Sequence, residues 1–254
     1  MDIQVNRPFH LQGPSNLREL GGYPARDGKY TKTHVFLRSD ALNTLTDEGG
    51  EYLYNYGLRL IVDLRGELVR LAQPDHVPST IRDVHVPLYD HLHAALVRAD
   101  LHMKDGHTEL SMPEIYKMIV DGDPEEVAKA LRDLIAADDC ALFHCTAGKD
   151  RTGIIAMLIL SLAGVPDDII VADYAESAEN ASAELRHEEE LEDKLAHAFV
   201  PVGAFESKPA FMETLLSHIN TKYGSAEKYV RDIGITDEEI NRLYEKFLTT
   251  EKPA

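Results

Sequence analysis

The amino-acid sequence predicts an α/β fold in which a mostly parallel central sheet is flanked by helices. Short apolar segments alternate with helical segments up to about residue 165, and strands separated by helices favour parallel pairing. After that point the pattern is almost wholly helical, which predicts a helical C-terminal region. The stretch Tyr89–Ile119 is longer than a connection between two sheet elements needs, so we expect a helical insertion there, either a surface excursion or a lid.

The expected strands are short and apolar, and the expected helices have helical spacing or an acidic first turn after a cap residue, as at Asp123 and Thr236. The strands lie near Val35–Leu37, Leu58–Leu64, Val84–Leu88 and Ala141–Cys145. The helices lie near Asp47–Tyr56, Pro124–Ala137, Thr152–Ala163, Pro166–Glu179, Ala181–Ala198, Pro209–Tyr223, Ala226–Asp232 and Asp237–Leu248.

Length and composition favour one domain over residues 1–254, with a possible lid insertion at about residues 89–119. The chain has 254 residues, of which 44% are hydrophobic and 28% charged, and no linker, repeat or low-complexity tract divides it. Residues Met1–Pro8 have no basic region followed by an apolar run, and the longest apolar stretch is too short to span a bilayer. We expect a cytoplasmic protein without stable membrane insertion, although secretion without a leader leaves no mark on a sequence.

The net charge of −18 bounds the partners of the chain. It argues against nucleic acid and against general adhesion to anionic membranes. An acidic protein also repels a phosphate dianion at long range, so a phosphate site in this chain must supply strong local positive charge.

The most informative motif is His144–Gly153, which reads HCTAGKDRTG. A cysteine and an arginine six positions apart, with Gly148 between them, can close a tight loop whose backbone N–H groups converge on one dianion. The preceding Cys140–His144 suits a buried strand, and the following Thr152–Gly164 suits a buried helix whose N-terminus faces the loop. We expect the phosphate to be bound by Thr146, Ala147, Gly148, Lys149 and Arg151.

This motif contains candidates for the nucleophile, for the phosphate clamp and for two supporting groups. Cys145 is the candidate nucleophile, because a helix N-terminus and neighbouring cations favour a thiolate. Arg151 can grip two phosphoryl oxygens through the transition state. The Thr152 hydroxyl can assist the thiolate as a leaving group, or simply cap the helix, and His144 is expected to hold the loop backbone.

The general acid has two candidates. Asp150 lies next to the arginine clamp and could stay protonated near the leaving oxygen, or could brace the loop. Asp63 ends the buried strand from Leu58, where ligands bind in parallel sheets, and with Arg65 it could serve the site or brace the sheet as an ion pair. Lys149 adds a second cation, which favours highly anionic substrates such as phosphoinositides beside phosphotyrosine.

Other readings of the motif fail. A nucleotide P-loop needs Gly at position 143, where this chain has Phe, and Ser or Thr at position 150, where it has Asp. A zinc site needs more ligands at fixed spacing than Cys140, His144 and Cys145 provide, so no metal is expected. The two cysteines point to opposite faces of one strand and should not form a disulfide.

The motif His144–Gly153 resembles the loop of bacterial protein tyrosine phosphatases, a family related to dual- and triple-specificity enzymes that act on phosphoproteins and phosphoinositides. The resemblance covers most of the chain. It continues at Asn16–Gly22, Phe36–Asp40, Val62–Arg65 with Glu67, Tyr223–Tyr229 and the helix from Thr236.

This resemblance implies the cysteine-dependent phosphatase fold and a metal-independent phosphomonoester hydrolase that forms a phosphocysteine intermediate, without metal or organic cofactor. Its substrate would be a phosphorylated protein or a phosphoinositide, and phosphate its product. By motif position it implies Cys145 as nucleophile, Arg151 as clamp, Asp150 as acid and Asp63 as a second acidic participant. The chain has no Trp, so it lacks the Trp-Pro-Asp acid loop of eukaryotic enzymes.

Two alternatives belong to other classes. The first is a catalytically inactive module that captures phosphoproteins or inositol phosphates. The second is an arsenate or sulfur transferase, which needs a resolving cysteine within reach of the nucleophile; Cys140 is badly placed for that role.

Overall fold

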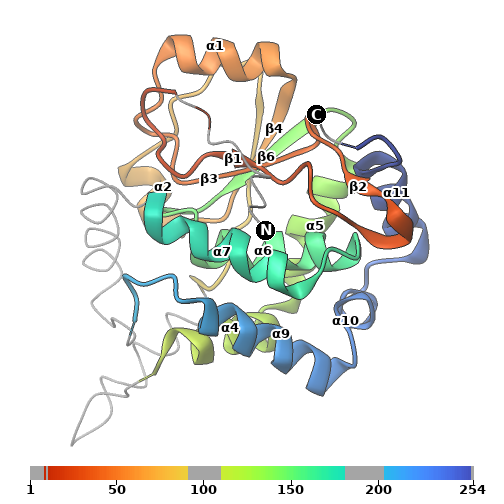
Figure 1. The fold of residues 1–254 in the computed structure, drawn as a ribbon. Helices are drawn as coiled ribbons and strands as arrows, with labels where there is room; N and C mark the ends of the chain where they lie inside the picture. Colours follow the sequence, from red (N-terminus) through yellow and green to blue (C-terminus); the bar gives the residue numbers. More distant parts are fainter. Residues whose placement is uncertain (1–8, 10, 91–109, 181–202, 253–254) are drawn as a thin grey trace, which may run out of the picture.

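The computed structural model describes residues 9, 11–90, 110–180 and 203–252, and it confirms the expected α/β fold. Its main sheet has five strands in the order β1-β3-β6-β4-β5. These are β1 (Arg18–Glu19), β3 (Phe36–Ser39), β6 (Cys140–His144), β4 (Leu58–Asp63) and β5 (Arg82–His85). The last four strands in this order run parallel, and β1 adds an antiparallel edge to β3. The carboxyl ends of the parallel strands therefore meet at one edge of the sheet (Figure 1).

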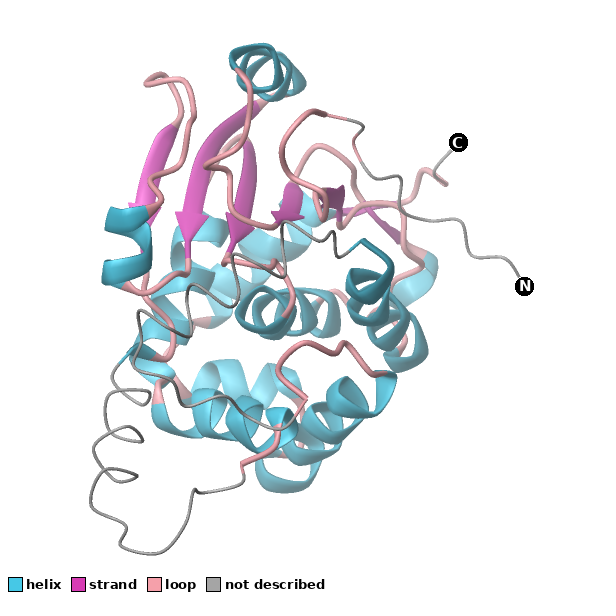
Figure 2. Cartoon of the chain, turned by 90° about the vertical axis from the view of Figure 1, so that its left-hand side faces the viewer, coloured by secondary structure: helices cyan, strands magenta, loops and turns pink. Residues whose placement is uncertain are grey.

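The described helices divide between the two faces of the sheet. They are α1 (Asp47–Tyr56), α2 (Glu67–Ala72), α4 (Met112–Gly122), α5 (Pro124–Ala136), α6 (Asp150–Leu162), α7 (Asp167–Asn180), α9 (Pro209–Tyr223), α10 (Ala226–Asp232) and α11 (Asp237–Phe247), with a short 3-10 helix at Arg26–Gly28. Helix α1 lies on one face, and α5, α6 and α7 lie on the other with α4 and α9 beyond them (Figures 1 and 2). The side with more helices therefore holds the larger core.

Strand β6 shows how alternation along a strand builds both cores. Ala141 and Phe143 point into the larger core, whereas Cys140 and Leu142 point into the smaller core under α1. Cys145 follows in the larger core, so the two cysteines lie on opposite faces, and both are free thiols. Residues Ile154–Leu160 of α6 are almost completely buried, which explains why this helix is apolar all round.

A second small sheet joins the N-terminal part of the fold to the segment after α11. Strand β2 (Tyr30–Thr31) pairs antiparallel with β7 (Leu248–Thr249), which directly follows α11. The contact places the last helix against the N-terminal part of the fold. Neither strand, nor β1 or α2, was among the expected elements.

Several boundaries differ from expectation. Helix α6 begins two residues earlier than expected, because Asp150 and Arg151 already form its first turn. Strand β5 lies at Arg82–His85 rather than at Val84–Leu88. The end of the expected insertion is α4. Residues 91–109 of that insertion and the whole of the expected helix Ala181–Ala198 lie outside the described residues.

The described helices include none that combines the length and the apolar character of a membrane-spanning segment.

Candidate active site

The candidate phosphate loop lies at the carboxyl edge of the sheet, between β6 and α6. Cys145 comes directly after β6 and is 2% exposed, and Arg151 is the second residue of α6. The four residues between Cys145 and α6, Thr146–Lys149, must therefore turn within a short span. The N-terminus of a helix of 13 residues faces this turn, and such an end carries the positive pole of the helix dipole.

The carbonyl oxygens of the loop are held from its outer side. The backbone N–H of Ala41 donates to Thr146 O at 2.9 Å. The Asn16 amide donates to Ala147 O at 2.9 Å and to Gly148 O at 3.2 Å. Arg38 Nη2 also donates to Gly148 O, at 2.8 Å.

This arrangement determines the direction of the loop N–H groups. The described peptide bonds are all trans, and a trans peptide points its N–H opposite to its C=O. Since three successive carbonyls turn toward Ala41, Asn16 and Arg38, the N–H groups of residues 147–149 turn toward the inner side of the loop. Successive N–H groups that converge in this way form an anion-binding concavity.

Gly148 lets the loop approach β3. Its φ is +65°, and a Cβ atom at this position would lie 2.3 Å from the backbone oxygen of Ser39. The left-handed conformation and the lack of space each require glycine here.

The brace outside the loop is anchored on α7. Asp173 Oδ1 accepts a hydrogen bond from Arg18 Nε at 3.2 Å, and Asp173 Oδ2 accepts one from Arg38 Nη1. Arg18 Nη1 also donates to Asn16 O at 3.1 Å. Burial raises the pKa of Asp173, but the charges of Arg38 and Arg18 outweigh it and keep that pKa below its usual value. Asp173 is thus a buried carboxylate that fixes two arginines, one of which holds the loop.

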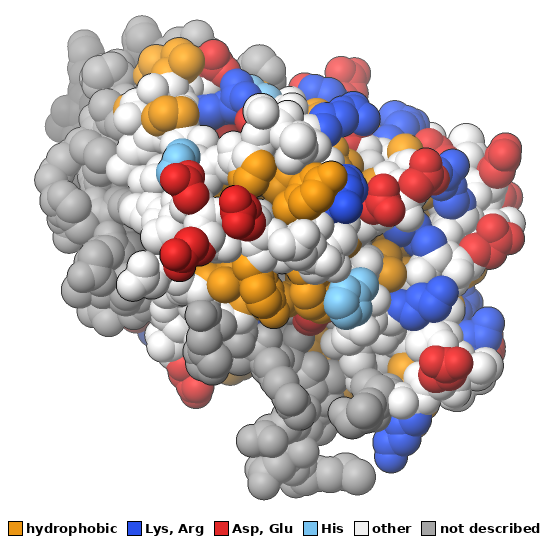
Figure 3. All heavy atoms as spheres, turned by 90° about the horizontal axis from the view of Figure 1, so that it is seen from above, with side chains coloured by type: hydrophobic (Ala, Val, Ile, Leu, Met, Phe, Trp, Pro, Cys, Tyr) orange, Lys and Arg blue, Asp and Glu red, His pale blue; other side chains and the backbone are white. Residues whose placement is uncertain are grey.

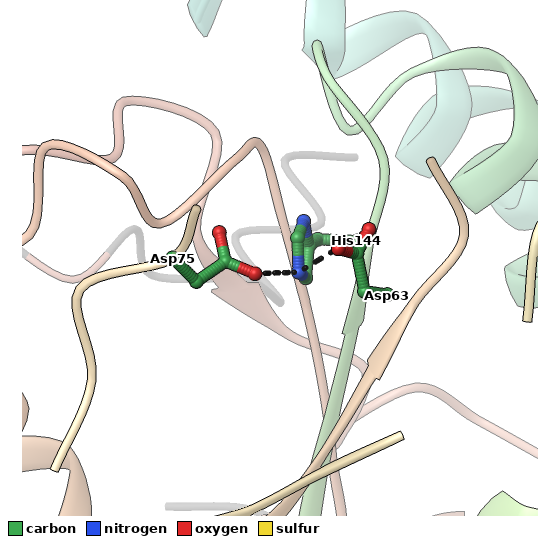
Figure 4. A group of neighbouring side chains, drawn as sticks. All are labelled: Asp63, Asp75 and His144. Carbon is green, nitrogen blue, oxygen red and sulfur yellow. Dashed lines mark ion pairs between the residues drawn. The ribbon is translucent and has the colours of Figure 1, made fainter. Parts of the chain in front are cut away.

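A second buried cluster lies beneath the loop around His144 (Figure 4). His144 Nε2 lies 3.0 Å from Asp75 Oδ2 and 3.9 Å from Asp63 Oδ1. Arg65 Nη2 contacts both carboxylates, at 2.8 Å from Asp63 and 2.9 Å from Asp75. The other ring nitrogen of His144, Nδ1, lies 3.1 Å from Cys145 O.

The charges in this cluster set the protonation of His144. Burial lowers the pKa of His144, but Asp75 and then Asp63 outweigh it and raise the pKa to about 9. Burial raises the pKa of Asp75, and His144 and then Arg65 bring it down to about 2. At neutral pH the ring is therefore an imidazolium, which suits the expected role of holding the loop backbone and excludes a role as a base.

Asp63, Asp75 and His144 also have the residue types and spacing of a metal site. The Arg65 guanidinium bridges both carboxylates, and the protonated ring has no lone pair to offer. These three residues therefore do not fit a metal ion, and the cluster is an ion-pair network.

The structure places Asp63 where it braces the sheet. Its two oxygens accept three hydrogen bonds from Arg65, from the backbone N, Nε and Nη2, at 2.8–2.9 Å. Burial raises its pKa, yet His144 and Arg65 hold the pKa below the usual value. Of the two roles open from the sequence, this geometry favours the ion-pair brace over a proton donor.

Asp150 occupies a different environment at the start of α6. Its side chain is 19% exposed, Oδ1 accepts a hydrogen bond from the Tyr116 hydroxyl, and Oδ2 lies 3.5 Å from Lys149 Nζ. Lys149 Nζ also donates to Ala204 O, in the segment before α9. Asp150 thus has one fixed oxygen and one oxygen at the cationic side of the loop.

The two threonines of the motif have buried side-chain hydroxyls. Thr146 and Thr152 are 1% and 0% exposed, and neither Oγ1 has a hydrogen-bond partner within the described parts of the chain. A buried hydroxyl without a partner is costly, so these oxygens are available to a bound anion or a neighbouring sulfur.

The structure adds five residues that had no assigned role in the sequence analysis: Asn16, Arg18, Arg38, Asp75 and Asp173. The first three stand in motifs that carried the family resemblance, at Asn16–Gly22 and Phe36–Asp40, and that signal could have marked them. Asp75 and Asp173 stand in no motif quoted above.

The chain is similar in sequence to known tyrosine phosphatases. The profile of the Tyrosine phosphatase family matches residues 9–249. A Tyrosine-protein phosphatase of Nostoc commune is 32% identical over 219 residues, which cover 82% of this chain and 72% of the relative. The Triple specificity protein phosphatase PtpB of Mycobacterium tuberculosis is 27% identical over 279 residues, with 89% of this chain and 97% of the relative covered.

A similar solved structure is that of P. aeruginosa TpbA, which has 18% identity and a TM-score of 0.36 and covers 66% of this chain and 91% of that chain. On the match of its sequence from residue 9 to residue 249, the chain belongs to the tyrosine phosphatase family.

Proposed function

We propose that this chain, acting as one domain, hydrolyses phosphate monoesters through a phosphocysteine intermediate, with phosphotyrosine as its first substrate. The observation that carries the proposal is the loop whose carbonyls of Thr146, Ala147 and Gly148 are held outward. Inward N–H groups above a buried cysteine and at the head of a helix form a cradle for a phosphoryl group.

In the first step the Cys145 thiolate attacks phosphorus in line, and the bond to the ester oxygen breaks. Arg151 grips two non-bridging oxygens as charge redistributes. In the second step water attacks the phosphocysteine, releases orthophosphate and restores the thiolate. The hydroxyl of Thr152, which has no hydrogen-bond partner among the described residues, is suited to donate to the sulfur as it leaves.

Asp150 is the proposed general acid. It gives its proton to the leaving oxygen in the first step and takes one from water in the second. Asp63 is assigned a positioning role, because Arg65 holds both of its oxygens. A phosphate dianion in the loop competes with Asp150 for the Lys149 ammonium, 3.5 Å away, which leaves Oδ2 of Asp150 open to the substrate.

Phosphoserine, phosphothreonine and phosphoinositides are the further candidate substrates. The relative named a triple-specificity phosphatase supports this breadth. Lys149 supports it too, because a second cation at the loop favours substrates with more than one phosphate.

The first experiment is replacement of the nucleophile. Cys145→Ser should abolish turnover of p-nitrophenyl phosphate and of a phosphotyrosine peptide, while orthophosphate still binds in a calorimetric titration. A Cys140→Ser variant is the matched control, since that thiol lies in the opposite core and should leave turnover intact. Turnover by Cys145→Ser would contradict the mechanism.

An inactive binding module is the alternative. Vanadate, which mimics the trigonal bipyramidal transition state, should inhibit the wild-type protein. A protein that only captures phosphate esters has no rate to inhibit, so wild-type protein without activity toward any phosphotyrosine, phosphoserine or phosphoinositide substrate would favour the binding module.

A further inference from the structure

Two buried tyrosines form a hydrogen-bonded pair behind the candidate loop. Tyr116 of α4 and Tyr174 of α7 are 0% and 1% exposed, and their hydroxyl oxygens lie 2.6 Å apart. Their rings meet edge to face, with centroids 6.2 Å apart and an interplanar angle of 81°. The pair joins two helices that are distant in the sequence.

The Tyr116 hydroxyl makes a second hydrogen bond, in which it donates to Asp150 Oδ1. A phenol has a single proton to donate, and an ionised carboxylate can only accept. The direction of donation is therefore from Tyr174 to Tyr116 and from Tyr116 to Asp150. Burial and then the charge of Asp150 raise the pKa of Tyr116 well above its usual value, so this donor keeps its proton at all working pH values.

Packing holds both phenols in place. Tyr174 lies against Gly153 of the motif, where an added Cβ would come within 3.0 Å of its ring. Tyr116 projects into the larger core with Met112, Ile115 and Ile119 of its own helix. A hydroxyl with so little freedom fixes the oxygen that it contacts.

The contact distinguishes the two oxygens of Asp150. Oδ1 is occupied by Tyr116, whereas Oδ2 faces the Lys149 side of the loop. A neutral carboxyl whose Oδ1 accepts a hydrogen bond must carry its proton on Oδ2. When that proton leaves, the same hydrogen bond stabilises the carboxylate that forms.

We propose that Tyr116 is a positioning residue for proton transfer: it holds Oδ1 of Asp150, so that the transferable proton sits on Oδ2 and faces the leaving oxygen. Tyr174 supports it by donating to the Tyr116 hydroxyl. This inference rests on the proposed role of Asp150 as general acid.

The test compares leaving groups. The tyrosine of a phosphotyrosine peptide has a pKa of about 10 and needs a proton as it leaves, whereas p-nitrophenol leaves readily as an anion. Tyr116→Phe should lower kcat/KM for the phosphotyrosine peptide about tenfold and that for p-nitrophenyl phosphate by less than about twofold. The ratio kcat/KM reports the steps up to formation of the phosphocysteine, and in those steps only the peptide leaving group needs the acid. The hydrolysis of the phosphocysteine is common to both substrates and does not enter this comparison.

Two variants serve as controls. Tyr229→Phe removes another buried hydroxyl, which donates to Val120 O at 2.8 Å and makes no contact with Asp150. This variant should leave both rates unchanged. Tyr174→Phe should give a smaller selective loss than Tyr116→Phe. Thermal melting of all three variants shows whether a loss of rate reflects a loss of folded protein.

A double-mutant cycle separates positioning from a general structural effect. If Tyr116 acts through Asp150, the double variant Tyr116→Phe/Asp150→Asn should be no slower than Asp150→Asn alone. Additive losses would overturn the proposal, and so would equal losses with both substrates in Tyr116→Phe. If Asp150→Asn shows no leaving-group selectivity, the proposed acid fails together with this inference. If Asp150→Asn is selective and Tyr116→Phe is not, only this inference fails.

Discussion

At Gly148 the loop backbone lies against Ser39 of β3. Replacing this glycine, together with a control glycine that has free space around it, should separate the free-energy cost of the steric clash from that of the left-handed conformation. Gly148→Ala must accommodate a φ of +65° and a Cβ 2.3 Å from Ser39 O. We expect a loss of about 3 kcal/mol in the free energy of unfolding, and a fall of about 100-fold in kcat/KM because the loop shifts. Urea unfolding and turnover of p-nitrophenyl phosphate measure the two effects.

The matched control is Gly224→Ala after α9. Its φ is +89°, but the nearest atom to an added Cβ is Lys228 Cδ at 3.8 Å. This variant should lose only about 1 kcal/mol, the conformational part, and keep full activity. If both variants lost the same free energy of unfolding, the contact between the added Cβ and Ser39 would contribute nothing to the destabilisation.

His144 should make the folded protein less stable as the pH rises into the alkaline range. Its pKa is raised from 6.5 to about 9, so its contribution is complete below pH 6.5 and is lost as the pH rises through about 9. The loss is up to roughly 3 kcal/mol. Asp75 has the opposite sign: its pKa is lowered to about 2, so its contribution is lost only as the pH falls toward that value.

The measurement is urea unfolding at pH 6 and at about pH 8.5, in the wild type and in Asp75→Asn. The variant should lose stability at pH 6 and show a weaker decline toward pH 8.5, because His144 then has only Asp63 to hold its proton against Arg65. A decline as steep as that of the wild type would rule out Asp75 as the main partner of His144.

The sequence and the structure contribute differently at this scale. The spacing from Cys145 to Arg151 identifies the loop because the chemistry requires those residues at neighbouring positions in the chain. Asp75 and Asp173 were missed because their partners are distant: Asp173 lies 155 positions from Arg18. A lone aspartate in a sequence carries no sign of the buried charge that it meets.

Helix α7 is the element that carries the loop brace, and Asp173→Asn tests it. The change leaves Arg18 and Arg38, both 0% exposed, without the carboxylate that compensates them. A buried charge that loses its partner costs about 3–5 kcal/mol, and Arg38 can then release Gly148 O. We expect the free energy of unfolding, measured in urea, to fall by that amount. We also expect kcat to fall at least tenfold, because small displacements of a site are enough to slow catalysis.

Glu176→Gln on the same helix is the control for Asp173→Asn. Its carboxylate is 3.9 Å from Arg18 Nε and its side chain is 28% exposed, so we expect less than about 1 kcal/mol. A comparable loss in both variants would mean that the helix is sensitive to any change of charge, and that Asp173 has no special role.

Elements were predictable in proportion to their local signals. Helices α1, α9 and α10 have the predicted bounds, helped by a capping threonine or serine or by proline at the first turn. Strands β1, β2 and β7 have two residues each, too few to show alternation, and they exist only because a partner strand lies beside them. Helix α2 leaves Leu68 and Leu71 exposed, so its apolar pattern does not resemble that of a buried helix.

At the scale of the whole molecule, the net charge of −18 should select among substrates. Acidic and basic side chains are interspersed on the face shown in Figure 3, so on this face the repulsion is a sum rather than the effect of one patch. Phosphotyrosine peptides with basic flanks should have a kcat/KM about fivefold above those with acidic flanks at low salt, and the ratio should approach one at about 0.5 M salt. A ratio independent of salt would place the selectivity in direct contacts.

The arrangement of the layers was predictable in outline from the alternation of strands and helices. The unequal division of helices between the two faces was not, because it follows from which face each connection crosses. The order of the strands also depends on long-range pairing, and it places β6, which carries the loop, between β3 and β4.

The outer brace of the loop has a consequence for how the protein is made. Asn16 lies 131 positions before Ala147, to whose carbonyl oxygen it donates a hydrogen bond. Arg18 likewise lies 155 positions before Asp173, its ion-pair partner. During synthesis on a ribosome, the N-terminal segment therefore emerges long before the parts that it must grip. The nascent chain cannot shape the loop until α7 has left the exit tunnel, so catalytic competence should not arise before that point.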